Sequence, residues 1–160
     1  MSEIVVLQQE DKKGENYLRT VFNVVEQRLK KQEQINKYFF SDVVQNKQLS
    51  SSFIADVEKA KGLIIILSSM EEADLQAWVS HQKTVTGKII LPIIVNQEIN
   101  FGIKTKYDLK LFVSCVGRFY FLDGIYVYDS NFLTPVKIEK EQERKINTEL
   151  ERFLAYMRAV

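Results

Sequence analysis

The sequence predicts an α/β domain built on a five-stranded parallel sheet, with strand order 2-1-3-4-5 and helices on both faces in a three-layer sandwich. The apolar runs at residues 63–67 and 89–95 are hydrophobic throughout, as expected for strands buried on both faces. Segments with helical periodicity separate the strand-like runs. Right-handed crossovers and short connections leave few topologies for this alternation, and the order 2-1-3-4-5 is the natural one.

The first half of the chain alternates strand and helix signals. A β-branched run at residues 4–7 predicts the first strand, and residues 38–40 suit the second. Helical spacing of apolar side chains predicts a helix between them, and these side chains are Leu18, Val21, Phe22, Val25 and Leu29. The serines at 50–52 are N-cap candidates for a helix that carries Phe53, Ile54 and Val57. Gly62 suits a left-handed cap at the end of that helix.

The second half continues the alternation. Residues 73–83 can form a short helix, and its buried stripe would be Leu75, Trp78 and Val79. Gly87 marks the step into the fourth strand and Gly117 the step into the fifth. Aromatic residues gather around the fifth strand, where sheet packing explains them: Phe119, Tyr120, Phe121, Tyr126 and Tyr128. A charged amphipathic helix follows, with an inner face of Ile146, Leu150, Phe153, Leu154 and Met157.

Composition indicates one cytoplasmic domain over residues 1–160. The 22 Lys and Arg against 21 Asp and Glu give a net charge of +1, so no global field recruits nucleic acid or an anionic membrane. The single cysteine, Cys115, cannot form an internal disulfide, which fits a reducing compartment. The N-terminus has no basic region and makes a poor signal peptide. The apolar runs are far shorter than the roughly 18–20 residues that span a bilayer.

Three segments match a known family in order and spacing. Gly87-Lys88 leads into the apolar run at 89–95, Tyr107-Asp108-Leu109-Lys110 opens an apolar helix, and a strand pattern follows from Gly124 to Ser130. This order resembles the C-terminal half of the NAD(P)H-dependent FMN reductases, notably those of alkanesulfonate systems. The resemblance implies a flavodoxin-like fold, FMN and NAD(P)H as cofactors, and homo- or hetero-oligomers with a related flavin reductase subunit.

In such a sheet, ligands bind outside the carboxyl ends of the strands where the strand order reverses, so the loops there decide the function. The first loop lacks the Gly-Ser-x-Arg turn of the family. A divergent phosphate cradle would use Gln9, Lys12, Lys13, Gly14 and Asn16. The carboxylates of Glu10 and Asp11 would repel a phosphate. The alternative is a solvated charged turn, with Asn16 or Glu15 near the helix start.

The second and third loops also depart from the family. In the second, Ser68 matches the start of a Thr/Ser-Pro-x-Tyr motif, whereas the proline and tyrosine are missing. Ser68 and Ser69 are cofactor-binding candidates, and the alternative is that Ser69 or Asp74 caps the next helix. The amides of the third loop suit a flavin pyrimidine edge or an exposed turn, and they are Asn96, Gln97 and Asn100.

Other chemistry has less support in the sequence. One histidine, His81, and one cysteine do not make a metal cluster of the usual kind, and Cys115 suits a packed core thiol. Three functions therefore remain. The first is a divergent flavin reductase subunit that supports a flavin-bearing partner, and the second is an independently active NAD(P)H:FMN oxidoreductase with a non-standard site. The third is a flavin-free module. Glu10 and Asp11 fit the acidic pair of a receiver-like domain, whereas Ser68 and Ser69 leave the position of its phosphorylatable aspartate empty. For a TIR-like domain, Glu71 and Glu72 lie early in the region of the catalytic glutamate, without the usual Trp-Cys context.

Overall fold

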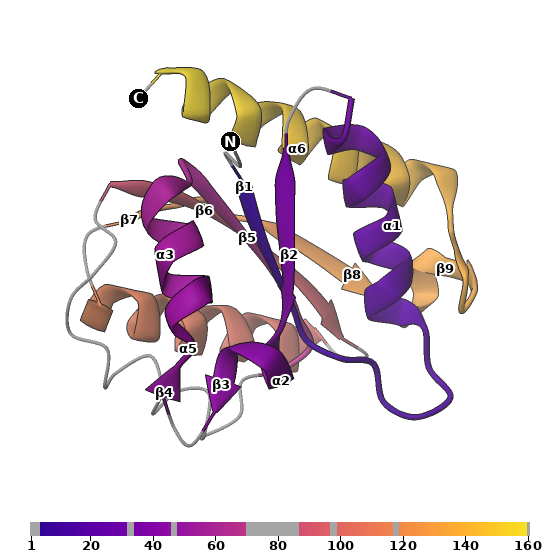
Figure 1. The fold of residues 1–160 in the computed structure, drawn as a ribbon. Helices are drawn as coiled ribbons and strands as arrows, with labels where there is room; N and C mark the ends of the chain where they lie inside the picture. Colours follow the sequence, from indigo (N-terminus) through magenta and orange to yellow (C-terminus); the bar gives the residue numbers. More distant parts are fainter. Residues whose placement is uncertain are drawn as a thin grey trace.

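The computed structural model describes residues 4–31, 34–45, 48–69, 87–96, 99–116 and 119–159, and its centre is a parallel sheet (Figure 1). Neighbouring strands follow the order β2-β1-β5-β6-β7, and β8 also pairs with β6. The strands are β1 (Ile4–Gln8), β2 (Ile35–Phe39), β5 (Gly62–Leu67), β6 (Lys88–Asn96), β7 (Phe119–Phe121) and β8 (Ile125–Tyr128). The predicted order 2-1-3-4-5 is confirmed.

Helices cover both faces of the sheet. Figure 1 shows α1 (Tyr17–Leu29) and α6 (Lys140–Ala159) on one face, and α3 (Ser51–Lys59) and α5 (Ile99–Val116) on the other. Alternate side chains of β1 pack into the two hydrophobic layers that lie between the sheet and the helices on each face. Ile4 and Val6 pack with the α1–α6 layer, whereas Val5 and Leu7 pack with the α3 side. The completely buried strand β5 contributes to both layers, as its continuous apolar run predicts.

The predicted cap at the N-terminus of α3 is confirmed, whereas the predicted cap at its C-terminus is not. Ser50 caps α3, because its Oγ accepts a hydrogen bond from the amide of Phe53 at 3.3 Å. The prediction of a left-handed cap at Gly62 is wrong, since α3 ends at Lys59 and Gly62 begins β5. A Cβ on Gly62 would lie 2.3 Å from the ring of Phe153, so α6 packs directly on this backbone. The glycine serves close packing there.

The fifth strand position is split in two. β7 pairs with the first part of β6 and β8 with the last part, both in parallel. The break lies beside Pro92, whose missing N–H and bulky ring disturb a ladder. Gly124 has a φ of 82° there, and a Cβ on it would lie 2.3 Å from the carbonyl oxygen of Pro92. Pro92 and Gly124 therefore form one close backbone approach.

Two other predicted boundaries are corrected. The second strand ends at Phe39, because Phe40 begins the short helix α2 (Phe40–Val43). Helix α5 begins at Ile99, so Gly102 lies inside a helix that was expected to open near Tyr107. The ring of Tyr126 lies 3.1 Å from where a Cβ on Gly102 would be, which explains the glycine by packing. The helix predicted at 73–83, His81 and Gly117 lie outside the described residues.

Small elements complete the part of the chain that the structure describes, and none of them was predicted. They are β3 (Val44–Gln45), β4 (Gln48–Leu49), the 3-10 turn η1 (Asp129–Asn131), β9 (Phe132–Thr134) and β10 (Lys137–Ile138). β3 and β4 form one antiparallel pair, and β9 and β10 form another. The β9–β10 pair is tied to α1, because the hydroxyl of Thr20 donates to the carbonyl of Pro135 at 2.8 Å. Within the described part of the chain, no helix has the length and apolar character to cross a membrane.

Candidate functional site

The strand order reverses between β1 and β5, and the loops that follow these two strands meet there. Gln9 spans the junction. Its Oε1 accepts hydrogen bonds from the amide and the hydroxyl of Ser68, at 2.8 and 2.9 Å, and from the amide of Ser69 at 3.3 Å. Its Nε2 donates to the carbonyl of Ser69 at 2.9 Å. Three predicted site residues therefore come together, and they bind one another.

The first turn of α1 is the second part of this site. The carboxylate of Asp11 accepts hydrogen bonds from the backbone amides of Leu18 at 2.8 Å and Arg19 at 3.0 Å. Free amides at a helix N-terminus, together with the helix dipole, are what an anion such as phosphate needs. Asp11 takes that place with an anion of the chain itself. The described residues of this loop therefore do not fit an FMN phosphate on these two amides.

Glu10 has a different partner. One of its carboxylate oxygens accepts hydrogen bonds from the amide of Ser41 at 3.2 Å and from the hydroxyl of the same residue. Ser41 lies in α2, so Glu10 ties the first loop to the segment after β2. The two adjacent carboxylates thus serve two different helices. They do not converge on a common point as an acidic pair of a receiver-like site would.

The remaining candidates of the first loop do not gather into a cradle. Lys12 and Lys13 are exposed, and the carbonyl of Lys12 accepts a backbone hydrogen bond from Glu15 at 2.9 Å in a local turn. Gly14 has a φ of 82°, with open space where a Cβ would be. Asn16 is the residue before α1, and its side chain makes no capping hydrogen bond within the described structure. Binding of a cofactor by these residues stays a prediction.

The second and third loops are described in part. The carbonyl of Ser68 accepts a hydrogen bond from the hydroxyl of buried Thr105 at 3.4 Å, which connects the end of β5 to α5. Asn96 ends β6 in register with Tyr128. Asn100 lies in α5 and not in a loop, whereas Gln97 lies outside the described residues. The structure thus brings only the first two loops into direct contact through described side chains.

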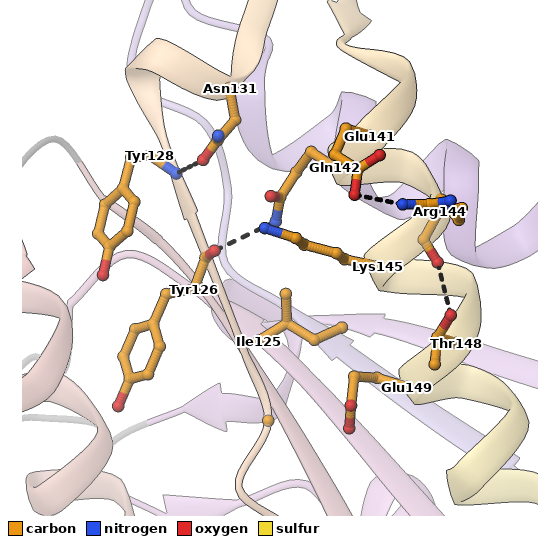
Figure 2. Close-up of a pocket in the computed structure, with 11 residues that line it drawn as sticks. Ile125, Tyr126, Tyr128, Asn131, Glu141, Gln142, Arg144, Lys145, Thr148 and Glu149 are labelled. Atoms are coloured by element: carbon orange, nitrogen blue, oxygen red, sulfur yellow. Dashed lines mark hydrogen bonds and ion pairs between the residues drawn. The ribbon is translucent and has the colours of Figure 1, made fainter.

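A separate groove of about 720 Å³ lies between β8 and α6, and sequence reasoning did not find it (Figure 2). Most of its polar groups are already paired. Gln142 donates to the carbonyl of Tyr126 at 3.2 Å, and Arg144 forms an ion pair with Glu141 at 2.5 Å. The ring of Tyr126 points away from α6 toward Gly102 of α5. The groove is therefore mainly a packing seam between the strand and the last helix.

One ionisable side chain near the carboxyl edge of the sheet, Tyr38, has a shifted pKa. Partial burial raises the pKa of the Tyr38 hydroxyl above its ordinary value, and a hydrogen bond to the carboxylate of Asp56 adds to the rise. Asp56 also accepts a hydrogen bond from the amide of Asn36 at 3.2 Å, so this cluster joins β2 to α3. Among the described residues, no group of three or more His, Cys, Asp or Glu side chains could hold a metal ion.

No family of known proteins and no curated protein sequence matches this chain. Solved structures do match it in fold. An NADH:FMN oxidoreductase solved in its apo form is 12% identical, with a TM-score of 0.71 over 95% of this chain and 88% of that chain. Oxidised flavodoxin 1 of Bacillus cereus is 15% identical, with a TM-score of 0.64 over 95% and 97% of the two chains.

A flavodoxin of Fusobacterium nucleatum, solved with flavin mononucleotide bound, is 16% identical, with a TM-score of 0.57 over 95% of this chain and 98% of that chain. At such low identity these similarities concern the fold, which is the one that flavodoxins and FMN oxidoreductases share. The specific FMN reductase family is not established by them. The chain has a flavodoxin-like α/β fold whose reversal point is bridged by Gln9 and whose first helix is capped by Asp11.

Proposed function

We propose that the chain is a divergent subunit of a flavin-dependent oxidoreductase, which supports a flavin-bearing partner and does not hold FMN by itself. The observation behind this proposal is the Asp11 carboxylate on the first amides of α1. Hydrogen bonds to a charged group contribute roughly 1.5–3 kcal/mol each. A phosphate would have to displace both bonds and then tolerate a displaced carboxylate beside it. The first loop therefore favours its own anion over that of a cofactor.

The Gln9 bridge supports the same proposal. A flavin ring needs space and free polar groups between the first two loops, whereas the amide of Gln9 already satisfies Ser68 and Ser69 there. Each such hydrogen bond contributes about 0.5–1.5 kcal/mol net, so the bridge as a whole resists opening. In the partner, FMN would accept hydride from NAD(P)H, as flavin cofactors do. This chain would contribute a scaffold and a rigid carboxyl edge.

The experiment recovers the affinity-tagged chain from the cells that naturally express it and measures protein mass, flavin content and NAD(P)H oxidation of the recovered complex. We expect a stoichiometric second chain that carries the flavin, with reductase activity that falls when this chain is removed. A chain recovered alone with bound FMN would instead favour the independently active oxidoreductase. A chain recovered alone and without flavin would contradict both the subunit proposal and the independently active oxidoreductase. It would favour a function that does not involve flavin.

A further inference from the structure

A cavity of about 410 Å³ opens on the α1 face of the sheet, beside the edge strand β2. Gln8 of β1, Arg19 of α1 and Lys37 of β2 contribute polar groups to its lining, and the rings of Phe22 and Phe39 contribute apolar walls. The cavity lies on the opposite face of β1 from the cluster that contains Leu7, because side chains alternate along a strand. Its size falls within the range of small-molecule sites, roughly 300–1,000 Å³.

Gln8 is the most informative residue of this lining. Its side chain is only 1% exposed, and its Oε1 has no hydrogen-bond partner among the described residues. Gln8 is in register with Phe39 of β2 and with Ile66 of β5, so the strand ladders on both sides hold its backbone in place. Buried polar atoms in folded proteins are nearly always paired. Because Gln8 lines the cavity, a ligand bound there can supply the hydrogen-bond donor that this buried oxygen lacks.

The two cations of the lining have no carboxylate partner within ion-pair distance among the described residues. The ammonium of Lys37 lies 3.8 Å from the ring centroid of Phe22 and 4.3 Å from that of Phe39. Burial is the main cause that lowers the pKa of Lys37 below its ordinary value of 10.5. The guanidinium group of Arg19 offers several N–H donors. Both side chains can receive an anionic group from a ligand.

The carboxylates beside the cavity do not neutralise these cations directly. Both oxygens of Asp11 accept bonds from α1, and one oxygen of Glu10 accepts from Ser41. Glu10 and Asp11 still line the cavity, so its wall presents both signs of charge. A ligand that is only anionic would meet repulsion from them, whereas one that carries both charges would match the wall.

We propose that this cavity binds a free α-amino acid. The carboxylate of the ligand faces Arg19 and Lys37, and its ammonium group donates to Oε1 of Gln8 with Glu10 and Asp11 nearby. The aromatic walls receive the side chain of the ligand. This site is separate from the junction that Gln9 spans, so the inference stands whether or not the chain takes part in flavin chemistry.

The test titrates the ¹⁵N-labelled full chain with L-leucine, L-glutamine and L-serine in separate experiments and follows the side-chain amide of Gln8 by NMR. We expect saturable shifts with a Kd of about 1 mM or tighter for at least one of them. For L-leucine, the matched compounds are 4-methylpentanoate, which lacks the ammonium group, and isoamylamine, which lacks the carboxylate. Each should bind at least about tenfold more weakly than the amino acid, as the loss of one charged contact implies.

Three variants, at Gln8, Lys37 and Arg19, assign the contacts, and a fourth serves as the control. Gln8→Leu removes the acceptor and Lys37→Met removes the cation, and each should weaken binding about tenfold or more. Lys12→Met is the matched control, because Lys12 is exposed and does not line the cavity. If Gln8→Leu fails to fold, Lys37→Met and Arg19→Gln decide the question. Absence of saturable shifts with all three amino acids, or unchanged binding in both Lys37→Met and Arg19→Gln, would overturn the proposal.

Discussion

Replacement of Asp11 by alanine tests the cap on α1 directly. The substitution removes the acceptor from the amides of Leu18 and Arg19. Loss of a side-chain cap typically costs ~1 kcal/mol of unfolding free energy. Loss of a carboxylate from a helix N-terminus costs a further ~0.3–1 kcal/mol. We therefore expect the free energy of unfolding to fall by about 2 kcal/mol. For a domain of this size, that corresponds to a fall in Tm of about 4–8 °C.

The assay is thermal unfolding followed by far-ultraviolet circular dichroism, with urea unfolding as a second measurement. Glu15→Ala is the matched control, since it removes a carboxylate from the same loop and leaves the two amide hydrogen bonds intact. Its effect should stay within about 0.5 kcal/mol. Inorganic phosphate should raise the Tm of Asp11→Ala more than that of the wild type, because only the variant has free amides at the helix N-terminus. Equal destabilisation by both substitutions, with no difference in the response to phosphate, would refute the reasoning.

Three further substitutions have defined outcomes. Gln9→Ala removes four hydrogen bonds between the first two loops and should lower the free energy of unfolding, measured in urea, by about 2 kcal/mol. An unchanged free energy of unfolding would contradict a stabilising role for these bonds. Gly14 and Gly124 share a φ of 82°, so alanine at either should cost about 1–2 kcal/mol. Only Gly124→Ala also drives a Cβ against Pro92, and its Tm should fall clearly further than that of Gly14→Ala; equal Tm values would contradict this. The raised pKa of Tyr38 means that its contribution to stability is complete below pH 10.0 and is lost as the pH rises above that value; Tyr38→Phe should flatten this alkaline limb in urea unfolding, and an unchanged limb would contradict the assignment.

Much of the fold follows from local patterns. The apolar run of β5 predicts burial on both faces, and the helical spacing from Leu18 to Leu29 predicts α1. These signals are strong because each element must bury a defined face. The break between β7 and β8 was not predictable in the same way, since it depends on the approach of Gly124 to Pro92 across the sheet. Such contacts between distant residues leave little trace in a local pattern.

In the candidate site, too, the sequence predicts which residues lie together but not which contacts they make. Sequence reasoning selected Gln9, Ser68 and Ser69 as residues of one edge, and the structure brings them together. It did not foresee that they bind each other, because hydrogen-bond partners depend on side-chain directions that loop composition does not fix. Asp11 was expected to repel a phosphate, and its carboxylate instead takes the place of one at α1. The distance between Asp11 and the helix start hid this cap, since caps are usually sought in the residue next to the helix.

The central claim is that the isolated chain does not bind FMN. The most direct measurement is an absorbance spectrum of the purified wild-type chain, followed by titration with micromolar FMN, the concentration range that corresponds to about −8 kcal/mol of binding free energy. We expect a colourless protein and no saturable change in flavin absorbance or fluorescence, because Asp11 and Gln9 already occupy the groups that FMN would need. A yellow protein, or saturable binding in that range, would contradict the claim and show that the first two loops open to admit the cofactor.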